Sequence, residues 1–201
     1  RARNNNEDSV AVDEPSCLIV LADGMGGYNA GEVASGMATT VITTEMQQLL
    51  AKVKPYEIDP ETNKIFAARM VREQVLKANA SSYHAAQSQP HYAGMGTTLV
   101  VCLFYDNKAL VAHLGDSRLY RMRDNVLKQV TRDHSLLQEQ IDSGLITPEQ
   151  AKHAQHKNLV TKALGIDPTV EPEIREYETR PGDIYLLCSD GLCDMVEDGD
   201  I

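Results

Sequence analysis

The stretch TTLVVCLFYDNKALVAHL, residues 97–114, decides the fold class of this chain. Two runs rich in valine, leucine and aromatic residues flank Asp106-Asn107, a pair of residue types that is typical of tight hairpin turns. A shorter version of the pattern follows at residues 117–130, where Asp124-Asn125 separates two strand-like segments. The spacing therefore predicts two consecutive β-hairpins, which we expect to form one antiparallel meander.

Three further segments have the patterns of strands. Residues 9–13 alternate apolar and polar side chains like a half-buried strand, and residues 17–22 form a continuous apolar run that stops before Asp23. Residues 183–188 form a similar run that stops before Asp190. We expect all three to be strands of antiparallel sheet.

Two long segments have helical periodicity. Residues 31–53 carry apolar side chains at steps of three and four, the period of an amphipathic helix. A second helix is predicted to begin with Asp59-Pro60-Glu61, a cap followed by proline and an acid, and to end near Tyr83. The polar residues 131–157 predict a small helical excursion, with capping-box spacing at Thr147-Pro148-Glu149-Gln150.

The connections between these elements indicate an α+β domain. Strands joined by hairpins form antiparallel sheet, which the two long helices would cover, whereas a doubly wound parallel sheet would need a helix between most strands. The length of 201 residues fits one domain. No apolar run approaches the roughly 20 residues that span a bilayer.

The charge of the chain argues against two classes of partner. It has 29 acidic and 19 basic residues, a net charge of −10, whereas nucleic acids and anionic membranes attract clustered lysine and arginine. We therefore expect partners that are proteins, small molecules or cations, with no nucleic acid and no membrane. The four cysteines form no C-x-x-C pair and predict free thiols in a reducing cytoplasm: Cys17, Cys102, Cys188 and Cys193.

Acidic residues recur where the apolar strands stop. Asp23, Asp116 and Asp190 each follow such a run, and Glu7-Asp8 precedes the first strand. One Asp-Gly pair taken alone is more often a turn than a ligand, so the argument rests on the recurrence. Carboxylates that converge repel one another unless cations neutralise them. All-oxygen ligands favour magnesium or manganese over zinc.

Six short motifs occur in order along nearly the whole chain. They are Arg3-x-x-x-Glu7-Asp8, Asp23-Gly24-Met25-Gly26-Gly27 followed by Ala30-Gly31-Glu32-Val33-Ala34-Ser35, Gly94-Met95-Gly96-Thr97-Thr98, Gly115-Asp116-Ser117-Arg118, Thr131-Arg132-Asp133-His134-Ser135, and Ser189-Asp190-Gly191-Leu192. The set resembles that of the metal-dependent protein phosphatases of type 2C, the PPM family, in its bacterial branch.

This resemblance implies a fold and a domain organisation. It implies a four-layer α-β-β-α sandwich of two antiparallel sheets flanked by helix pairs, with a small helical flap insert. Residues 1–201 would be a single phosphatase catalytic domain that includes a flap subdomain at about residues 132–160. Family members begin with an earlier strand and continue to an Asp-Asn pair that binds metal, so we expect this domain to be incomplete at both ends.

The resemblance also implies a two-metal site. Asp23 resembles the carboxylate that bridges both cations, Mn²⁺ or Mg²⁺. Glu7 and the carbonyl of Gly24 resemble ligands of one cation, and Asp190 resembles a ligand of the other. Asp8 would support these ligands without binding a cation itself.

Two further residues take roles from the resemblance. Asp116 resembles the acid that, with Asp190, holds a weaker third cation, and Arg3 resembles the arginine that binds the substrate phosphate. Arg3 and Asp23 would then be the catalytic residues. The implied reaction is hydrolysis of phosphoserine and phosphothreonine in proteins, by attack of a hydroxide that bridges the two metals.

The resemblance also implies partners for the protein. The substrates would be phosphorylated proteins, and the opposing enzyme would be a serine/threonine kinase. The protein would act in signal transduction as a monomer. The alternatives are a catalytically silent phosphatase-like binding or sensor module and a small-molecule phosphohydrolase, which would share the site and differ in the flap. Some members have histidine after the Asp-Gly pair, where this chain has Met25, which leaves the acid for the leaving group unassigned. His113 is expected to be a hydrogen-bonded core residue, and His134 either a cap or a substrate contact.

Overall fold

The computed structural model describes residues 6–27, 30–151 and 159–201, which contain two main antiparallel sheets and a small two-stranded one. The larger sheet has the order β1-β2-β6-β7-β10, and the short β5 pairs with the end of β2. The smaller sheet has the order β11-β8-β9. The strand bounds are β1 Asp8–Asp13, β2 Leu18–Met25, β5 Gly96–Thr97, β6 Leu99–Tyr105, β7 Lys108–Leu114, β8 Arg118–Arg123, β9 Val126–Gln129, β10 Glu173–Glu178 and β11 Ile184–Cys188.

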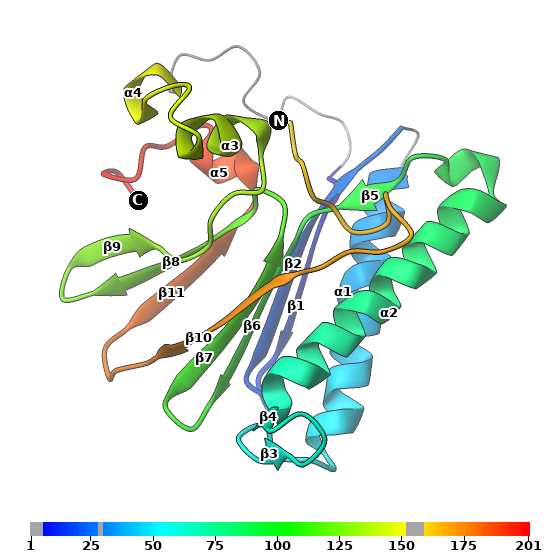
Figure 1. The fold of residues 1–201 in the computed structure, drawn as a ribbon, viewed down its shortest axis with the longest axis vertical. Helices are drawn as coiled ribbons and strands as arrows, with labels where there is room; N and C mark the ends of the chain where they lie inside the picture. The colour runs from blue at the N-terminus through cyan, green and yellow to red at the C-terminus, as the bar shows by residue number, and fades with distance from the viewer. Residues whose placement is uncertain (1–5, 28–29, 152–158) are drawn as a thin grey trace.

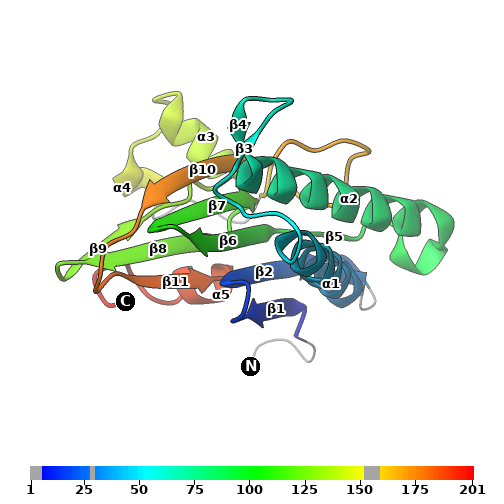
Figure 2. The same cartoon turned by 90° about the horizontal axis from the view of Figure 1, so that it is seen from below.

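Two long helices cover one face of the larger sheet. Helices α1 (Ala30–Leu50) and α2 (Phe66–Ser88) lie side by side along this face (Figures 1 and 2). The shorter elements are β3 Ile58–Asp59, β4 Lys64–Ile65, the 3-10 turn η1 Pro90–Tyr92, α3 Leu136–Asp142, α4 Pro148–Ala151 and α5 Asp190–Cys193. None of the described helices is both long and apolar enough to cross a membrane.

Strand β6 explains why the sheet is buried on both faces. Val101 and Leu103 point toward α1 and α2 and belong to the main core. Val100 and Cys102, which alternate with them, pack in the second core with Leu119 of the smaller sheet. Because successive side chains of a strand face opposite ways, a strand covered on both sides has a continuous apolar sequence. The predicted α+β class with antiparallel sheets is confirmed, and the described residues place a long helix pair on the larger sheet alone.

The two predicted hairpins form, but the single meander was wrong. Asp106 and Asn107 have φ angles of 44° and 56°, and Asp124 and Asn125 have 52° and 58°, as their turns require. Strands β6 and β7 belong to the larger sheet, however, and β8 and β9 to the smaller one. The chain crosses from one sheet to the other between β7 and β8, through Gly115, whose φ is 94°.

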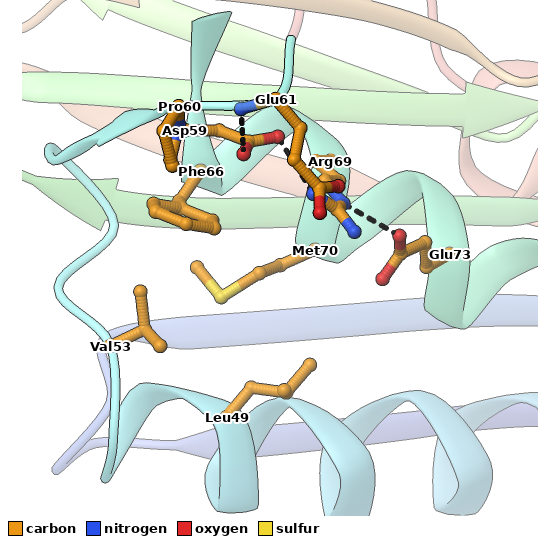
Figure 3. Close-up of a pocket in the computed structure, with 9 residues that line it drawn as sticks. All are labelled: Leu49, Val53, Asp59, Pro60, Glu61, Phe66, Arg69, Met70 and Glu73. Atoms are coloured by element: carbon orange, nitrogen blue, oxygen red, sulfur yellow. Dashed lines mark hydrogen bonds and ion pairs between the residues drawn. The ribbon is translucent and has the colours of Figure 1, made fainter.

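The predicted start of the second helix was also wrong. Asp59 caps a turn between β3 and β4: its carboxylate accepts hydrogen bonds from the Glu61 N–H at 3.0 Å and from the Thr62 hydroxyl at 2.7 Å. Arg69 of α2 reaches back to the same carboxylate at 2.9 Å, as Figure 3 shows. The helix itself begins at Phe66. The cap-like sequence therefore closes a small hairpin that precedes the helix.

Strand β10 was missed because it does not have an apolar pattern. Its sequence EIREYE is mostly charged, yet it pairs with β7 over its whole length, from Glu173 opposite His113 to Glu178 opposite Lys108. In the predicted excursion, the capping box of α4 is confirmed by reciprocal hydrogen bonds between Thr147 and Gln150 at 2.8 and 3.2 Å. Residues 152–158 of that segment lie outside the described residues.

Leu103→Ala tests the position of the main core. Leu103 has 0% exposure, so the shortened side chain leaves a cavity, and the free energy of unfolding should fall by about 2–5 kcal/mol. Leu145→Ala, at a leucine with 74% exposure, should change it by about 0.5 kcal/mol or less. Urea unfolding followed by circular dichroism measures both. Equal effects of the two substitutions would contradict this core.

Candidate active site

Asp23 and Asp8 lie opposite each other on neighbouring strands. The register of β1 and β2 pairs Asp8 with Asp23, so both carboxylates point to the same side of the sheet. The backbone of Asp23 is fixed on both sides: its N–H donates to the Thr98 hydroxyl at 3.1 Å, and its carbonyl accepts from the Thr97 hydroxyl at 2.9 Å. The main chain thus holds Asp23 firmly where β2 meets β5.

Asp190 reaches this place from the smaller sheet. It is the first residue of α5, directly after β11. The preceding Ser189 occupies the cap position of α5, but its hydroxyl donates to the Asp8 carboxylate at 3.0 Å. This bond joins the end of the smaller sheet to the edge strand of the larger one, and it places Asp190 beside Asp23.

Burial and two neighbouring carboxylates make Asp23 a weaker acid. Burial, followed by the charges of Asp8 and Asp190 and hydrogen bonds with both, raises the pKa of Asp23 to about 8. Near neutral pH and without a cation, Asp23 therefore keeps a proton. A hard divalent cation would replace that proton and neutralise the group, so the donor set fits such an ion.

Two glycines bring Glu7 and Gly24 together. A Cβ atom on Gly24 would lie 2.0 Å from the carbonyl oxygen of Gly31, and one on Gly31 would lie 2.8 Å from a carboxylate oxygen of Glu7. The Gly24 N–H donates to the Glu7 carbonyl at 3.0 Å, and the Ser35 hydroxyl donates to the same carbonyl at 2.6 Å. The start of α1 thus packs directly on the strand that carries Asp23.

Asp116 lies on the Asp190 side of this cluster. Burial, followed by the charges of Asp190 and Asp133, raises the pKa of Asp116 to about 6. Asp133 is itself held by Arg118 through contacts of 2.7 and 3.0 Å. Of the neighbouring charges, that of Asp190 has the largest effect on the pKa of Asp116.

Two hydroxyl groups connect Asp23 to the crossing between the sheets. The Thr98 hydroxyl, which accepts the Asp23 N–H, lies 2.7 Å from the hydroxyl of Ser117. Ser117 is the residue directly after Asp116. Sequence reasoning assigned no role to Thr98, Ser117 or Ser189, although each lies within a quoted motif. The sequence pattern that could have identified them is a small hydroxyl residue next to an acid or to the end of a strand. Arg3 lies outside the described residues.

His113 and His134 support the fold at the base of the excursion. His113 is buried and its Nε2 donates to the Arg132 carbonyl at 2.7 Å, which confirms the predicted hydrogen-bonded core role. His134 stacks on His113 with ring centroids 4.6 Å apart, and its Nδ1 accepts from the Gly115 N–H at 3.2 Å.

The remaining nitrogen of His134 faces Glu173 of β10. His134 Nε2 lies 3.6 Å from the Glu173 carboxylate. One ring nitrogen of each histidine and one oxygen of that carboxylate lie within 4.8 Å of one another. Burial, His113 and Lys162 lower the pKa of His134 to about 4, so the ring is neutral at pH 7. A neutral ring whose Nδ1 accepts an N–H carries its proton on Nε2. That nitrogen is a donor toward Glu173, so we assign this group a structural role.

Comparisons with known proteins agree with this arrangement. A family model described as protein phosphatase 2C matches residues 1–200. Serine/threonine phosphatase stp of Listeria welshimeri serovar 6b is 35% identical over 199 residues, which cover 98% of this chain and 75% of that protein.

Solved structures are similar over the same span. The serine/threonine phosphatase PstP/Ppp of Mycobacterium tuberculosis has a TM-score of 0.86 and 38% identity, with 98% of this chain and 77% of that chain covered. A structure of the catalytic domain of PstP in complex with two manganese ions has a TM-score of 0.81 and 38% identity, with 98% and 76% covered. The chain belongs to the protein phosphatase 2C family.

Proposed function

We propose that this chain is the catalytic domain of a metal-dependent serine/threonine protein phosphatase, which hydrolyses phosphoserine and phosphothreonine in proteins. The observation that carries the proposal is the buried contact of Asp8, Asp23 and Asp190. Burial, followed by the charges of Asp8 and Asp190 and hydrogen bonds with both, raises the pKa of Asp23 to about 8. Three carboxylates in contact destabilise the folded chain unless a cation neutralises them, so their arrangement indicates a cation site. Family membership gives the site its reaction class.

The donor set supports two cations of the manganese or magnesium type. In the proposed arrangement, Glu7 and the Gly24 carbonyl hold one cation, Asp190 holds the other, and Asp23 bridges them. Asp8, bonded to Ser189 at 3.0 Å, orients Asp23 and Asp190 from behind. All the donors are oxygens, the ligands that these hard cations prefer.

A third, weaker cation would lie between Asp116 and Asp190. Burial, followed by the charge of Asp190, raises the pKa of Asp116, and this effect of Asp190 supports the position. We also propose that residues 132–160 form a flap subdomain beside it, where α3 and α4 follow Asp133.

Bound cations would supply an acidified water nucleophile and would offset negative charge on the phosphoryl oxygens. The protein's own groups then have three tasks. Asp23 gives up its proton as the cations bind, Arg3 binds the phosphate dianion through its fork of N–H groups, and Asp8 keeps Asp23 in place through the shared edge of β1 and β2.

The substrates we propose are phosphorylated proteins, because the Listeria relative is a serine/threonine phosphatase. The opposing enzyme would be a serine/threonine kinase, and the domain would act as a monomer. The complete set of described acids at the junction argues against the catalytically silent alternative. The free cysteines among the described residues support a cytoplasmic location.

Asp23→Asn tests the proposed function. The amide cannot bridge two cations, so hydrolysis of a phosphothreonine peptide in Mn²⁺ should fall by about 100-fold or more. Asp124→Asn is the matched control, because it makes the same change at a hairpin turn with a φ of 52°, which asparagine adopts readily. Chelator should abolish the activity of the parent protein. Full activity of Asp23→Asn would overturn the assignment.

Gly31→Ala tests the packing that places Glu7 beside Gly24. The new Cβ would lie 2.8 Å from both the Glu7 carboxylate and the Gly24 backbone, so Mn²⁺ affinity should fall by about 10- to 100-fold. Gly36→Ala, on the same helix with open space around it, should keep the affinity and raise stability by up to about 1 kcal/mol. Isothermal titration calorimetry measures the affinities. Equal affinities would show that the close contact has no bearing on cation binding.

The pH dependence of stability without metal tests the raised pKa of Asp23. Its pKa is about 8 in the folded chain and 3.8 in its ordinary state. Between these values the folded chain keeps a proton that the unfolded chain has lost, so the free energy of unfolding should fall as pH rises from about 4 to about 8.

Asp23→Asn is the reference for this measurement, because it removes the titrating group. In chelator, urea unfolding of the parent protein should lose stability relative to Asp23→Asn as pH rises, and excess Mn²⁺ should reverse the loss. A difference between the two proteins that is constant with pH would contradict the raised pKa.

A further inference from the structure

Two cysteines lie on either side of Asp190. Cys188 is the last residue of β11 and Cys193 the last residue of α5, and their Sγ atoms are 3.5 Å apart. Both are free thiols. Asp190 is in the four-residue segment between them, so any change in the distance between the two sulfurs acts on the backbone that carries this acid.

We propose that Cys188 and Cys193 form a reversible disulfide that moves Asp190 away from Asp23 and switches the enzyme off. The effect on catalysis rests on the proposed function; formation of the bond does not. The site is a modification site for a small oxidant of the peroxide class.

The geometry favours formation of the Cys188–Cys193 disulfide and, with it, displacement of Asp190. A disulfide has an S–S distance of about 2.05 Å, so the sulfurs must approach by about 1.5 Å. Cys188 is held in the sheet by its pairing with Arg118 of β8. Helix α5 has only four residues, and none of them is buried. The approach is therefore expected to move α5, and with it Asp190, while β11 stays in place.

The bond would also affect Asp8. Ser189 lies between Cys188 and Asp190, and its hydroxyl holds the Asp8 carboxylate at 3.0 Å. A shift of this segment would strain the contact that joins the two sheets at the site. Oxidation should therefore weaken cation binding through two of the three carboxylates that contact one another.

An oxidant has access to one of the sulfurs. Cys193 is half-buried and lines an open pocket between α3 and the residues that follow α5, together with Ile141 and Met195. Cys188 is 6% exposed and lies behind it. The Cys193 sulfur also lies 3.7 Å from the Tyr120 hydroxyl, which Arg118 contacts at 2.9 Å. Cys193 is thus the sulfur that meets the oxidant, and Cys188 the one that resolves it.

The chemistry balances with hydrogen peroxide as the oxidant. The Cys193 sulfur attacks one peroxide oxygen, the O–O bond breaks, and the products are a Cys193 sulfenic acid and one water. The Cys188 thiol then attacks the Cys193 sulfur, and the S–S bond forms as the sulfenic oxygen leaves as a second water. The two thiols lose two electrons and two protons in total, and the peroxide gains them. A dithiol reductant reverses the bond.

The other cysteines provide internal controls. Cys102 is completely buried, and burial raises the pKa of its thiol to about 12, so it should not react in the folded protein. Cys17 is exposed in the turn before β2 and has no cysteine neighbour among the described residues. It is available to the oxidant but has no partner for an intramolecular bond.

The experiment treats the reduced protein with hydrogen peroxide and measures three properties. Mass spectrometry follows the tryptic peptide that begins at Glu176. Trypsin does not cut after Arg180, because a proline follows it, so this peptide holds both Cys188 and Cys193 and neither of the other cysteines. We expect it to lose both thiol hydrogens. Mn²⁺ affinity and phosphothreonine hydrolysis should each fall by about 10- to 100-fold, and dithiothreitol should restore both.

Two variants separate the outcomes. Cys193→Ser should keep the affinity and activity of the reduced parent and lose neither on peroxide treatment, whereas Cys17→Ser should respond like the parent. Retention of both thiols in the parent, or a disulfide that leaves Mn²⁺ affinity unchanged, would overturn the proposal. If the reduced parent binds Mn²⁺ but has no activity, the proposed function fails, while the peptide mass and the Mn²⁺ affinity still decide the fate of the disulfide.

Discussion

Repulsion among carboxylates is the constraint on which the rest of this structure depends. Asp8, Asp23 and Asp190 meet where the two sheets come together. Burial, together with the charges of the two neighbouring acids, raises the pKa of Asp23 to about 8, so Asp23 keeps a proton up to about that pH. Hydrophobic packing of the sandwich supplies the free energy that holds the acids together without a cation. The fold therefore stores an unfavourable charge arrangement, which is what gives the junction its affinity for divalent ions.

The supporting contacts are almost all made by small residues. Gly24 and Gly31 allow α1 to touch β2, Thr98 and Ser117 connect Asp23 to the sheet crossing, and Ser189 ties Asp8 to the segment of Asp190. A Cβ on Gly24 would lie 2.0 Å from the Gly31 carbonyl oxygen, so these two elements could not approach so closely with a larger residue there. The position of the acids is thus set by how closely α1, β2 and the segment of Asp190 pack together, and the acids themselves add only charge.

Much of this arrangement follows from sequence patterns. Acids at the ends of apolar runs predicted the meeting of Asp23 and Asp190, and the paired Asp-Asn residues predicted both hairpins, because positive φ angles have a local cause. The start of α2 could not be predicted, since Asp59 is captured by Arg69, a residue ten positions away. Strand β10 and the approach of Cys193 to Cys188 depend on tertiary packing, which no local period encodes.

The bond between Ser189 and Asp8 has a consequence for biosynthesis. It joins residues 181 positions apart, so Ser189 and the adjacent Asp190 leave the ribosome long after Asp8. Contacts of such long range form late, after the local hairpins and helices. A nascent chain that has folded β1, β2 and α1 still lacks Asp190. The junction of Asp8, Asp23 and Asp190 is therefore complete only after residue 190 has been synthesised and β11 has joined the smaller sheet.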